Sequence, residues 1–320
     1  MDNKQLYRTL CESPGSAIPV FQQAWWMDVV CQGKEWDVLL AMDGDRPLAA
    51  LPCLIRRRLG MTYVLQPQLT QFTGPLFFIP ADLSAARRPD FEHRVCQMLI
   101  DQLGALRLDY YCQCFAPTVT DWLPFYWAGY RQTTRYTYRL DDISDPQRVF
   151  DNFDRTKERQ RRIRRIADSY TVDTAIDADT FATFHAGYWH SRGQRDVTPH
   201  TLIRSVVDTA TTRRQGLTLG LRDAKGDLRA AWFAVYDSHC AHALLSAKAP
   251  DETSADTTAL LVWRLIEALS PHTAAFDFEG SMEPSLEYFY RSFGARQVPY
   301  HQVSLVRNRI IPLLLRMKKK

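Results

Sequence analysis

The chain has 320 residues, of which 46% are hydrophobic and 24% are charged. This much apolar material is enough for two cores and excludes a chain that is mainly disordered. Forty basic against 36 acidic residues give a net charge of +4, which is too mild for a dedicated nucleic-acid binder. No apolar run of about 18 residues occurs, so no membrane span is expected, and no secretory signal is expected at the start. The seven scattered cysteines indicate reduced thiols in a cytoplasmic protein.

The first half of the chain opens with a predicted β-hairpin. Residues 36–56 read as an apolar strand, the turn Asp43-Gly44-Asp45 and a second apolar strand. Residues 91–103 carry apolar side chains at helical spacing. A strand-like run follows at 106–115, and an aromatic run follows at 125–132. This half therefore predicts a hairpin, a helix, a strand, a second helix and a final strand.

The second half repeats this order. Residues 217–236 form another predicted hairpin around the turn Gly226-Asp227. Residues 256–269 read as an amphipathic helix, residues 274–278 as a strand, and residues 289–297 again as an aromatic run, which contains Phe293-Gly294. The repeat indicates a duplicated architecture or chance similarity of short apolar strings. We expect an α/β (α+β) fold in which mixed sheets are flanked by helices.

The boundary between the halves is predicted near 140–150, where turn residues break the periodicity. Ser144 or Asp145 can cap a helix that begins at Pro146. This helix, or a pair of helices, would carry an arginine-rich segment into the second half. We therefore expect domains at 1–143 and 144–320.

Four segments in the right order carry a resemblance to a known family. They are residues 21–26 (FQQAWW), 161–167 (RRIRRIA), 184–193 (FHAGYWHSRG, an aromatic run that ends in Arg-Gly) and 276–295 (FDFEGSMEPSLEYFYRSFGA). Together they resemble motifs of the FemABX-type aminoacyltransferases, a branch of the GNAT-fold N-acyltransferases. The resemblance implies two GNAT-like domains that face each other across a cleft. It also implies an acyl-CoA or aminoacyl-tRNA donor in the second domain and an amine acceptor in the cleft.

The sequence departs from the family pattern at three places. A basic residue with which members bind phosphate falls on Val30, which speaks against a UDP-linked muropeptide acceptor. The lysine of the closing helix falls on Tyr290, where acyl-CoA GNAT enzymes usually have tyrosine. The GNAT pyrophosphate loop falls on residues 249–255, which contain two acids and no glycine. The donor therefore stays open between acyl-CoA and aminoacyl-tRNA. By the resemblance, four residues are the candidates for binding the donor: Lys248, Ser254, Ala255 and Arg291.

Three residues near the end of the chain are the catalytic candidates. By the resemblance, Tyr290 is the general acid that protonates the leaving group. Glu279 follows the predicted strand at its carboxyl end, where open α/β sheets place ligands, and is the candidate base; Glu283 is the second choice. The alternatives are that Tyr290 packs in the core and that the two glutamates cap the following helix.

Two further pairs are candidates for binding substrate. By the resemblance, Arg192 can pair with a phosphate or carboxylate beside Trp189, although a charge at a helix C-terminus is the alternative. Gln71 and Thr73 lie in a polar, uncharged loop and can hydrogen-bond a sugar or peptide, although an ordinary connecting loop is the alternative.

The basic segments predict anionic partners only weakly. Residues 155–165 carry seven basic side chains and indicate either a solvated helix or contact with tRNA or anionic lipid. Residues 310–320 join apolar residues to terminal lysines, which suits peripheral contact with the inner face of a membrane or a frayed end. No metal site is expected, because neither Cys112-x-Cys114 nor the two histidines at 239 and 242 has a zinc spacing.

The sequence thus predicts a bacterial, cytoplasmic N-acyltransferase. The acceptor would be a sugar, a peptide or another small or peptidoglycan-precursor-like molecule of cell-wall chemistry. An amine of this acceptor would attack the acyl donor directly. The alternative is a degenerate GNAT-fold module that binds without catalysis at an anionic membrane or RNA. The oligomeric state stays open.

Overall fold

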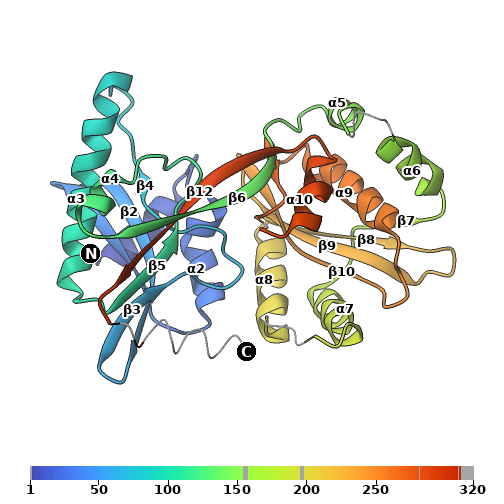
Figure 1. The fold of residues 1–320 in the computed structure, drawn as a ribbon, viewed down its shortest axis with the longest axis horizontal. Coiled ribbons are helices and arrows are strands. Elements are labelled where there is room, and N and C mark those ends of the chain that lie inside the picture. Colours follow the sequence, from blue (N-terminus) through green and yellow to red (C-terminus); the bar gives the residue numbers. More distant parts are fainter. Residues whose placement is uncertain (1, 154–157, 195–197, 281, 309, 311–320) are drawn as a thin grey trace. The chain divides into compact units, whose positions relative to one another are not determined.

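A computed structural model describes residues 2–153, 158–194, 198–280, 282–308 and 310 (Figure 1). The chain forms two compact units. Unit 1 contains the residues up to Arg135 together with the chain from Pro299 onward, and unit 2 contains Tyr136–Val298. The expected second domain, 144–320, includes the residues from Pro299 on, whereas these residues group with unit 1. The chain passes between the units within two strands, β6 and β12.

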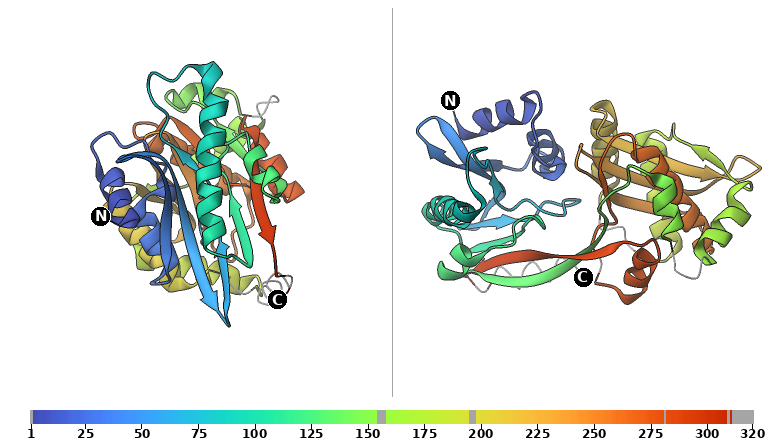
Figure 2. Two further views of the ribbon diagram at one scale, coloured as in Figure 1. Left: turned by 90° about the vertical axis from the view of Figure 1, so that its left-hand side faces the viewer. Right: turned by 90° about the horizontal axis from the view of Figure 1, so that it is seen from above.

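Unit 1 is a sheet with helices packed on it. The predicted hairpin forms, with Asp43 paired to Arg46 and Gly44 at a φ of 57° in the turn. The sheet has the order β1-β2-β3-β5-β12, in which β3 and β5 are parallel, and α3 packs along β1 and β2 (Figure 2, left). The elements are α1 (Asn3–Glu12), η1 (Val20–Gln22), α2 (Ala24–Cys31), β1 (Trp36–Asp43), β2 (Arg46–Arg58), β3 (Met61–Leu65), β4 (Leu76–Phe77), η2 (Ala85–Arg87), α3 (Arg88–Ala105), β5 (Tyr110–Cys114), α4 (Leu123–Trp127) and β6 (Arg131–Leu140).

Unit 2 is again a sheet with helices packed on it, and its strands have the order β6-β11-β10-β9-β8-β7. The second predicted hairpin pairs β8 with β9, and the turn contains Gly226 at a φ of 87°. Helix α9 covers one face of the sheet, and α7 and α8 cover the other (Figure 1). The elements are α5 (Pro146–Asp151), α6 (Glu158–Ala167), β7 (Thr171–Asp173), α7 (Ala178–Ser191), α8 (His200–Thr212), β8 (Gly216–Arg222), β9 (Leu228–Tyr236), β10 (Cys240–Lys248), α9 (Ala255–Leu269), β11 (Ala275–Asp277), α10 (Pro284–Arg291) and β12 (Arg296–Val306).

The start of unit 2 follows the sequence prediction closely. Asp145 is the N-cap of α5 and accepts a hydrogen bond from the Arg148 amide, and Pro146 is the first helical residue. The expected strand from Leu106, by contrast, begins only at Tyr110. Leu106 caps α3, and Arg107 has a φ of 51°, so these residues close the helix instead of extending a strand.

The core of unit 2 holds the segment from β11 to α10 in place. Phe293 is fully buried, and its ring lies 4.9 Å from Phe153 and 5.4 Å from Phe278. Gly294 follows with a φ of 77°, and a side chain there would crowd the Asn152 carbonyl. The Phe-Gly pair thus anchors the end of α10, and truncating a buried Phe of this kind costs about 3–5 kcal/mol.

Candidate functional site

The site in unit 2 is built where two parallel strands part. β10 and β11 pair in parallel only over Cys240–His242 and Ala275–Asp277. β11 ends at Asp277, whereas β10 continues to Lys248, so the second half of β10 runs on without this neighbour. The pairing of β10 with β9 also shifts between Ala243 and Leu245. Such bulges are frequent beside active sites, because they redirect backbone groups and side chains. We call this region the strand fork of unit 2.

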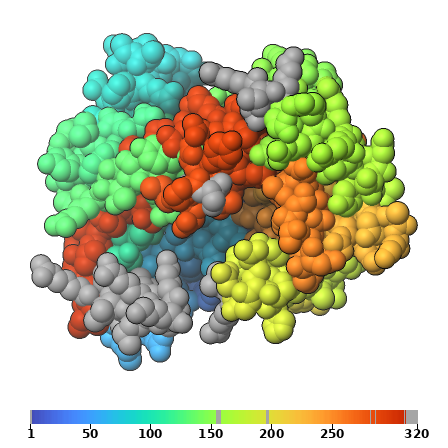
Figure 3. All heavy atoms as spheres, turned by 45° about the vertical axis from the view of Figure 1, so that its right-hand side comes forward, coloured from blue at the N-terminus to red at the C-terminus, as the bar shows by residue number. Residues whose placement is uncertain are grey.

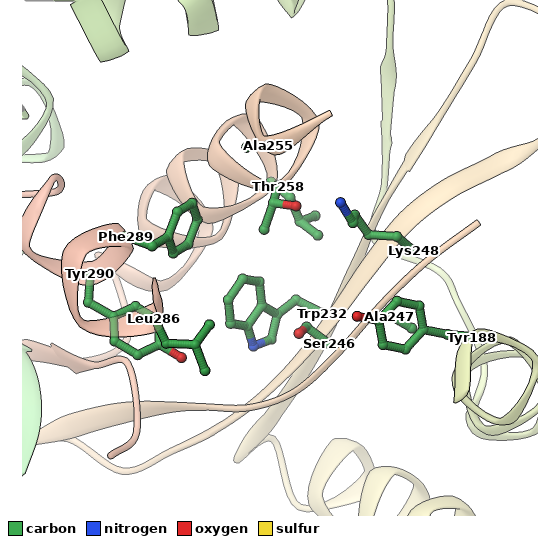
Figure 4. Close-up of a pocket in the computed structure, with 11 residues that line it drawn as sticks. Tyr188, Trp232, Ser246, Ala247, Lys248, Ala255, Thr258, Leu286, Phe289 and Tyr290 are labelled. Carbon is green, nitrogen blue, oxygen red and sulfur yellow. The ribbon is translucent and has the colours of Figure 1, made fainter. Parts of the chain in front are cut away.

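A cavity of about 290 Å³ opens at the fork, between β9, β10, α9 and α10 (Figure 4). Its wall is mostly apolar, and Lys248 is the only charged residue among the described side chains that line it. Ligand sites are usually concave and apolar with a few polar groups, as here. The lining residues are Tyr188, Trp232, Ser246, Ala247, Lys248, Ala255, Thr258, Leu261, Leu286, Phe289 and Tyr290.

Tyr290 joins the cavity to a group of ionisable residues behind it. Its ring is 9% exposed and packs on Phe278 at 5.0 Å and on Tyr138 at 5.8 Å. Burial, and then the charges of Glu279 and Asp277, raise the pKa of Tyr290 to about 12. The phenol is therefore a protonated donor at any physiological pH. The ring packs in the core, as the alternative interpretation expected, and it also lines the cavity, so the role of Tyr290 as general acid stays a prediction.

Behind Tyr290, a histidine and two carboxylates meet at the carboxyl end of β11. His242 Nδ1 and Glu279 Oε1 share a hydrogen bond of 2.9 Å. Asp277 Oδ1 accepts hydrogen bonds from the Glu279 amide at 2.8 Å and from the hydroxyl of Thr137. Glu279 has a φ of 65°, which a residue with a Cβ rarely adopts and which often marks a functional site. The Asp277 carboxylate thus holds Glu279 in a strained turn that faces His242.

Burial and the facing charges act in opposite directions on the pKa values of the His242–Glu279 pair. Burial raises the pKa of the Glu279 carboxyl, although the facing imidazole opposes this shift. Burial alone would lower the pKa of His242, but Cys240 and the Glu279 carboxylate raise it, and the net direction is upward. Opposed influences of this kind on a buried pair are typical of residues that handle protons in catalysis.

The same three residues are the ones that could hold a metal ion. Each offers one ligand atom, and these atoms lie within 4.8 Å of one another. However, His242 and Glu279 already bind each other, and Asp277 Oδ1 already accepts two hydrogen bonds. Because a metal would have to replace these bonds, the donor set fits a shared proton better than a cation.

The start of α9, on the other side of the cavity, is filled by the chain's own side chains. Ser254 caps the helix by accepting from the Asp256 amide at 3.0 Å, and the Ser254 amide donates to Glu252 at 2.9 Å. Lys248 Nζ donates to the Ser254 carbonyl at 3.3 Å. Burial, and to a lesser extent the charge of Arg192, lower the pKa of Lys248. The usual GNAT contact between this helix end and a pyrophosphate is therefore partly occupied.

Helix α6 packs against α9, and in Figure 3 the green segment that contains α6 adjoins the orange segment on the surface. Arg165 and Arg162 lie 3.5 and 3.9 Å from the Asp256 carboxylate. Arg162 also pairs with Glu158 at 2.8 Å, as the solvated-helix interpretation expects. Of the basic segment, Arg155 and Lys157 lie outside the described residues, as do residues 311–320 of the tail; Ile310 is exposed. In the described part of the chain, no helix is long and apolar enough to span a membrane.

The other candidates of unit 2 lie around the cavity. Lys248 and Ala255 line it, and Ser254 adjoins it. Arg291 is not among the lining residues and pairs with Glu287 at 2.6 Å. Glu283 is exposed at the N-cap of α10, the helix start that the alternative interpretation expected, and is not part of the His242 cluster.

Helix α7 reaches the cavity through Tyr188, which is next to the predicted substrate-binding residue Trp189. Trp189 donates its indole N–H to His185 at 3.2 Å, and Arg192 lies over the ring of Tyr188 at 5.3 Å. Tyr188 itself lines the cavity. The aromatic segment named by the sequence therefore reaches the site through a residue that the sequence analysis did not single out.

Gln71 and Thr73 lie in unit 1 and are buried. The Thr73 hydroxyl donates to Gln66 at 3.1 Å and accepts from Gln113 at 2.8 Å. These contacts account for Thr73 through the packing of its own loop, which is the connecting-loop alternative, and we carry neither residue into the mechanism.

Sequence reasoning missed His242 and Trp232. His242 was judged only against zinc spacings, while its partner Glu279 follows 37 residues later in the chain. The one available signal was the alternation of β10, which puts Cys240 and His242 on one face of the strand. Trp232 looked like an ordinary apolar residue of a predicted strand.

Comparisons with known proteins agree with this geometry. Residues 153–288 match the family described as Acetyltransferase (GNAT) domain, and no curated protein matches the chain. Among solved structures, FemX aligns with a TM-score of 0.68 at 10% identity and covers 94% of this chain and 96% of its own. A tandem GNAT protein from the clavulanic acid biosynthesis pathway aligns with a TM-score of 0.52 at 12% identity, and the alignment covers 96% of this chain and 95% of that one. L-PGS from Bacillus licheniformis aligns with a TM-score of 0.52 at 11% identity, and the alignment covers 90% of this chain and 89% of that one.

A parallel strand pair with flanking helices occurs in both units. The chain has a FemABX-like GNAT fold, and its residues 153–288 match a GNAT acetyltransferase domain.

Proposed function

We propose that this chain transfers an acyl group from an activated donor to an amine, and that the acyl end of the donor lies in the cavity at the strand fork of unit 2. One observation carries the proposal. Tyr290 lines the cavity, and its pKa is raised first by burial and then by the charges of Glu279 and Asp277, so the cavity adjoins the paired imidazole and carboxylate. A binding pocket beside groups that donate and accept protons is what amide formation requires.

The roles of the residues follow from the proton balance of the reaction. The amine attacks the donor carbonyl, so a C–N bond forms and the C–S or C–O bond to the leaving group breaks. The His242–Glu279 pair takes the proton that the amine loses, directly or through water, and this pair refines the sequence prediction of Glu279 alone. Tyr290 gives a proton to the departing thiolate or hydroxyl oxygen. Bound together, the reactants also gain from proximity.

The transfer is direct, without an acyl-enzyme. Cys240 is the thiol nearest to the pair, and burial raises its pKa. A nucleophilic cysteine needs the opposite, a lowered pKa that supplies thiolate. We therefore assign Cys240 to the packing of β10.

The lining favours an uncharged acyl group over an aminoacyl group. An aminoacyl donor carries an ammonium group close to its carbonyl. The only charged residue among the described lining side chains is the cationic Lys248, which would repel it. Apolar contacts with Leu261, Leu286 and Phe289 suit a short hydrocarbon chain instead. An acyl-CoA thioester is thus the proposed donor, and an amine of a sugar, peptide or cell-envelope precursor is the acceptor class that the FemABX resemblance implies.

The test uses two donors of nearly equal size. Butyryl-CoA and β-alanyl-CoA differ chiefly in a terminal methyl or ammonium group. Free thiol is followed with each donor and a panel of sugar, lysine and muropeptide amines, and products are weighed by mass spectrometry. We expect amine-dependent thiol release that is faster with butyryl-CoA. Faster release with β-alanyl-CoA would reverse the donor assignment, and no release with any acyl-CoA would contradict it.

A second candidate function is binding without turnover. The start of α9 favours it. The amides of Ser254 and Asp256 already donate hydrogen bonds to the chain's own side chains there. The carboxylates of Glu252 and Asp256 would also repel a pyrophosphate at this helix end. Such a module would bind acyl-CoA or another ligand in the cavity and release no thiol. The donor experiment separates the two functions when a binding measurement accompanies it.

A further inference from the structure

The indole N–H of Trp232 is a buried donor without a described partner. Trp232 lies in β9, is 4% exposed and lines the cavity. Its Nε1 is buried, and no residue in the described part of the chain accepts a hydrogen bond from it. Figure 4 shows the indole among the lining side chains, with its nitrogen on the edge remote from Thr258. The donor is thus built into the wall of the cavity.

An unpaired buried donor is costly unless something completes it. More than about nine in ten buried polar groups have a partner, and leaving one unpaired forfeits its hydration without return. Two other buried indoles of this chain are paired: Trp26 donates to Thr70 at 3.0 Å and Trp36 donates to Asp28 at 2.9 Å. Of the described residues that carry a buried polar atom without a partner, Trp232 is the one that lines this cavity, so its N–H points to an acceptor that a ligand brings.

The position of Trp232 in the sheet indicates which ligand atom accepts the hydrogen bond. Trp232 is directly opposite Ser246 of β10, in the half of β10 beyond its pairing with β11. Tyr290 lines the same cavity from α10. The donor carbonyl must lie within reach of Tyr290, because its leaving group takes a proton there. A carbonyl oxygen is a pure acceptor and an indole N–H is a pure donor.

We propose that Trp232 Nε1 donates a hydrogen bond to the carbonyl oxygen of the acyl donor and stabilises the oxyanion that forms on it during transfer. This inference rests on the proposed function and adds a catalytic residue to it. When the amine attacks, the C=O π pair moves onto oxygen, and the indole N–H faces the developing charge. When the leaving group departs with the proton of Tyr290, the pair returns and the carbonyl is restored. The indole keeps its proton throughout.

The first experiment observes the N–H itself. The protein is labelled with ¹⁵N at its indoles, and the Trp232 signal is assigned as the one that Trp232→Phe removes. Butyryl-CoA is then compared with S-butyl-CoA, its thioether, which lacks the carbonyl. We expect the Trp232 proton to move downfield with butyryl-CoA and to move much less with the thioether, while the signals of Trp26 and Trp36 stay in place.

A pair of variants tests the catalytic part. Trp232→Phe keeps a ring in the wall and removes the N–H, so we expect kcat to fall about 10²–10³-fold with little change in KM, which is the typical worth of one oxyanion donor. Its melting temperature should stay level or rise, because an unpaired donor is lost. Trp26→Phe in unit 1 removes a paired N–H, so its melting temperature should fall and its kcat should persist. This opposite pattern separates a catalytic role from a structural one.

Each outcome decides between the claims. If butyryl-CoA binds and is turned over but the Trp232 signal does not respond to the carbonyl, the inference about Trp232 is wrong and the proposed function stands. Unchanged kcat in Trp232→Phe would contradict it equally. If no acyl-CoA binds by native mass spectrometry, the proposed donor is wrong and the inference falls with it.

Discussion

The two units contain the same strand fork, and they finish it in opposite ways. In unit 1, β3 and β5 pair in parallel over Tyr63–Val64 and Tyr110–Tyr111, and the chain then folds back on the end of β5. Gln66 accepts from the Cys114 amide at 2.9 Å, while the Thr73 and Gly74 amides donate to the Cys114 carbonyl at 2.9 and 3.1 Å. In unit 2, the corresponding end of β10 opens onto a cavity.

The polar groups of the two forks differ in what surrounds them. In unit 1, Gln22 donates to the carbonyls of Thr73 and Gly74 at 3.2 and 2.7 Å, and Gln113 donates to the Thr73 hydroxyl, so the loop is tied to its surroundings. Each fork holds a left-handed residue with a side chain and a buried polar atom without a described partner, at Leu69 and Tyr111 in unit 1 and at Glu279 and Trp232 in unit 2. In unit 2, however, Trp232 lines a cavity and Glu279 pairs with His242, whereas the loop of unit 1 closes over the end of β5. The comparison therefore assigns structure to the fork of unit 1 and leads us to propose chemistry at that of unit 2.

The largest effect that this comparison predicts is on turnover in Glu279→Gln. The variant keeps the size of the side chain and removes the proton acceptor, so kcat should fall by about 10²–10³-fold. Circular dichroism and the melting curve should confirm that the variant folds. Turnover near the wild-type level in a folded Glu279→Gln protein would remove the His242–Glu279 pair from the mechanism.

Tyr290→Phe should have the next largest effect. The phenyl ring still packs on Phe278 and Tyr138, but no proton reaches the leaving group, and kcat should fall about 10–100-fold. The loss should shrink with donors whose leaving group is a better one, such as a thiophenyl ester. A loss of equal size for all leaving groups would mean that Tyr290 serves packing alone.

The comparison also predicts an effect confined to unit 1. In Gly74→Ala, the new Cβ would approach the Cα of Phe115 to 2.8 Å and its ring more closely still. Such overpacking costs about 1–3 kcal/mol of unfolding free energy. Denaturant titration should show this loss, while kcat of the folded variant stays at the wild-type value. A marked fall in kcat would show that the fork of unit 1 takes part in the reaction.

The pH dependence should have a single limb. Turnover should rise on the acid side as the His242–Glu279 pair loses its proton and becomes able to accept one from the amine. No alkaline fall should follow below about pH 10, because burial raises the pKa of Tyr290 to about 12 and the phenol keeps its proton. An alkaline limb that disappears in Tyr290→Phe would contradict the environment described for this residue.

The smallest expected effect is that of a chelator. His242, Asp277 and Glu279 are close enough to bind a metal, but their hydrogen bonds fit a shared proton better. Dialysis against EDTA should therefore leave kcat unchanged, and elemental analysis should find no stoichiometric zinc. Loss of activity that zinc restores would replace the proton pair with a metal centre.

Local patterns carried the prediction of the fold. The turns at Gly44 and Gly226 were readable, because a left-handed turn residue between two apolar strands has few other uses. The Asp145-Pro146 cap was readable for the same reason. The candidate site was only partly predictable. Glu279 and Tyr290 stand in a motif near one end of the chain, but pairing with His242 depends on which strands become neighbours.

Two properties of the site exist only in three dimensions. The sequence alone does not indicate that an indole N–H lacks a hydrogen-bond partner. For Trp232, this property becomes visible only in the folded structure. Thr73 shows the reverse. Its polar, uncharged loop looked open to substrate, yet the partners Gln66 and Gln113 come from other parts of unit 1 and bury it. Burial of polar residues depends on long-range packing, which the local sequence does not encode.

The central claim, that the open fork of unit 2 is the donor site, is tested most directly by binding to a blocked cavity. Thr258 lines the cavity from α9 and is only half-buried, so Thr258→Trp fills the space, while Thr212→Trp at the exposed end of α8 is the matched control. Native mass spectrometry would measure butyryl-CoA on both variants and on the wild type. We predict a stoichiometric complex for the wild type and for Thr212→Trp and its loss in Thr258→Trp. Undiminished binding to Thr258→Trp would contradict the account.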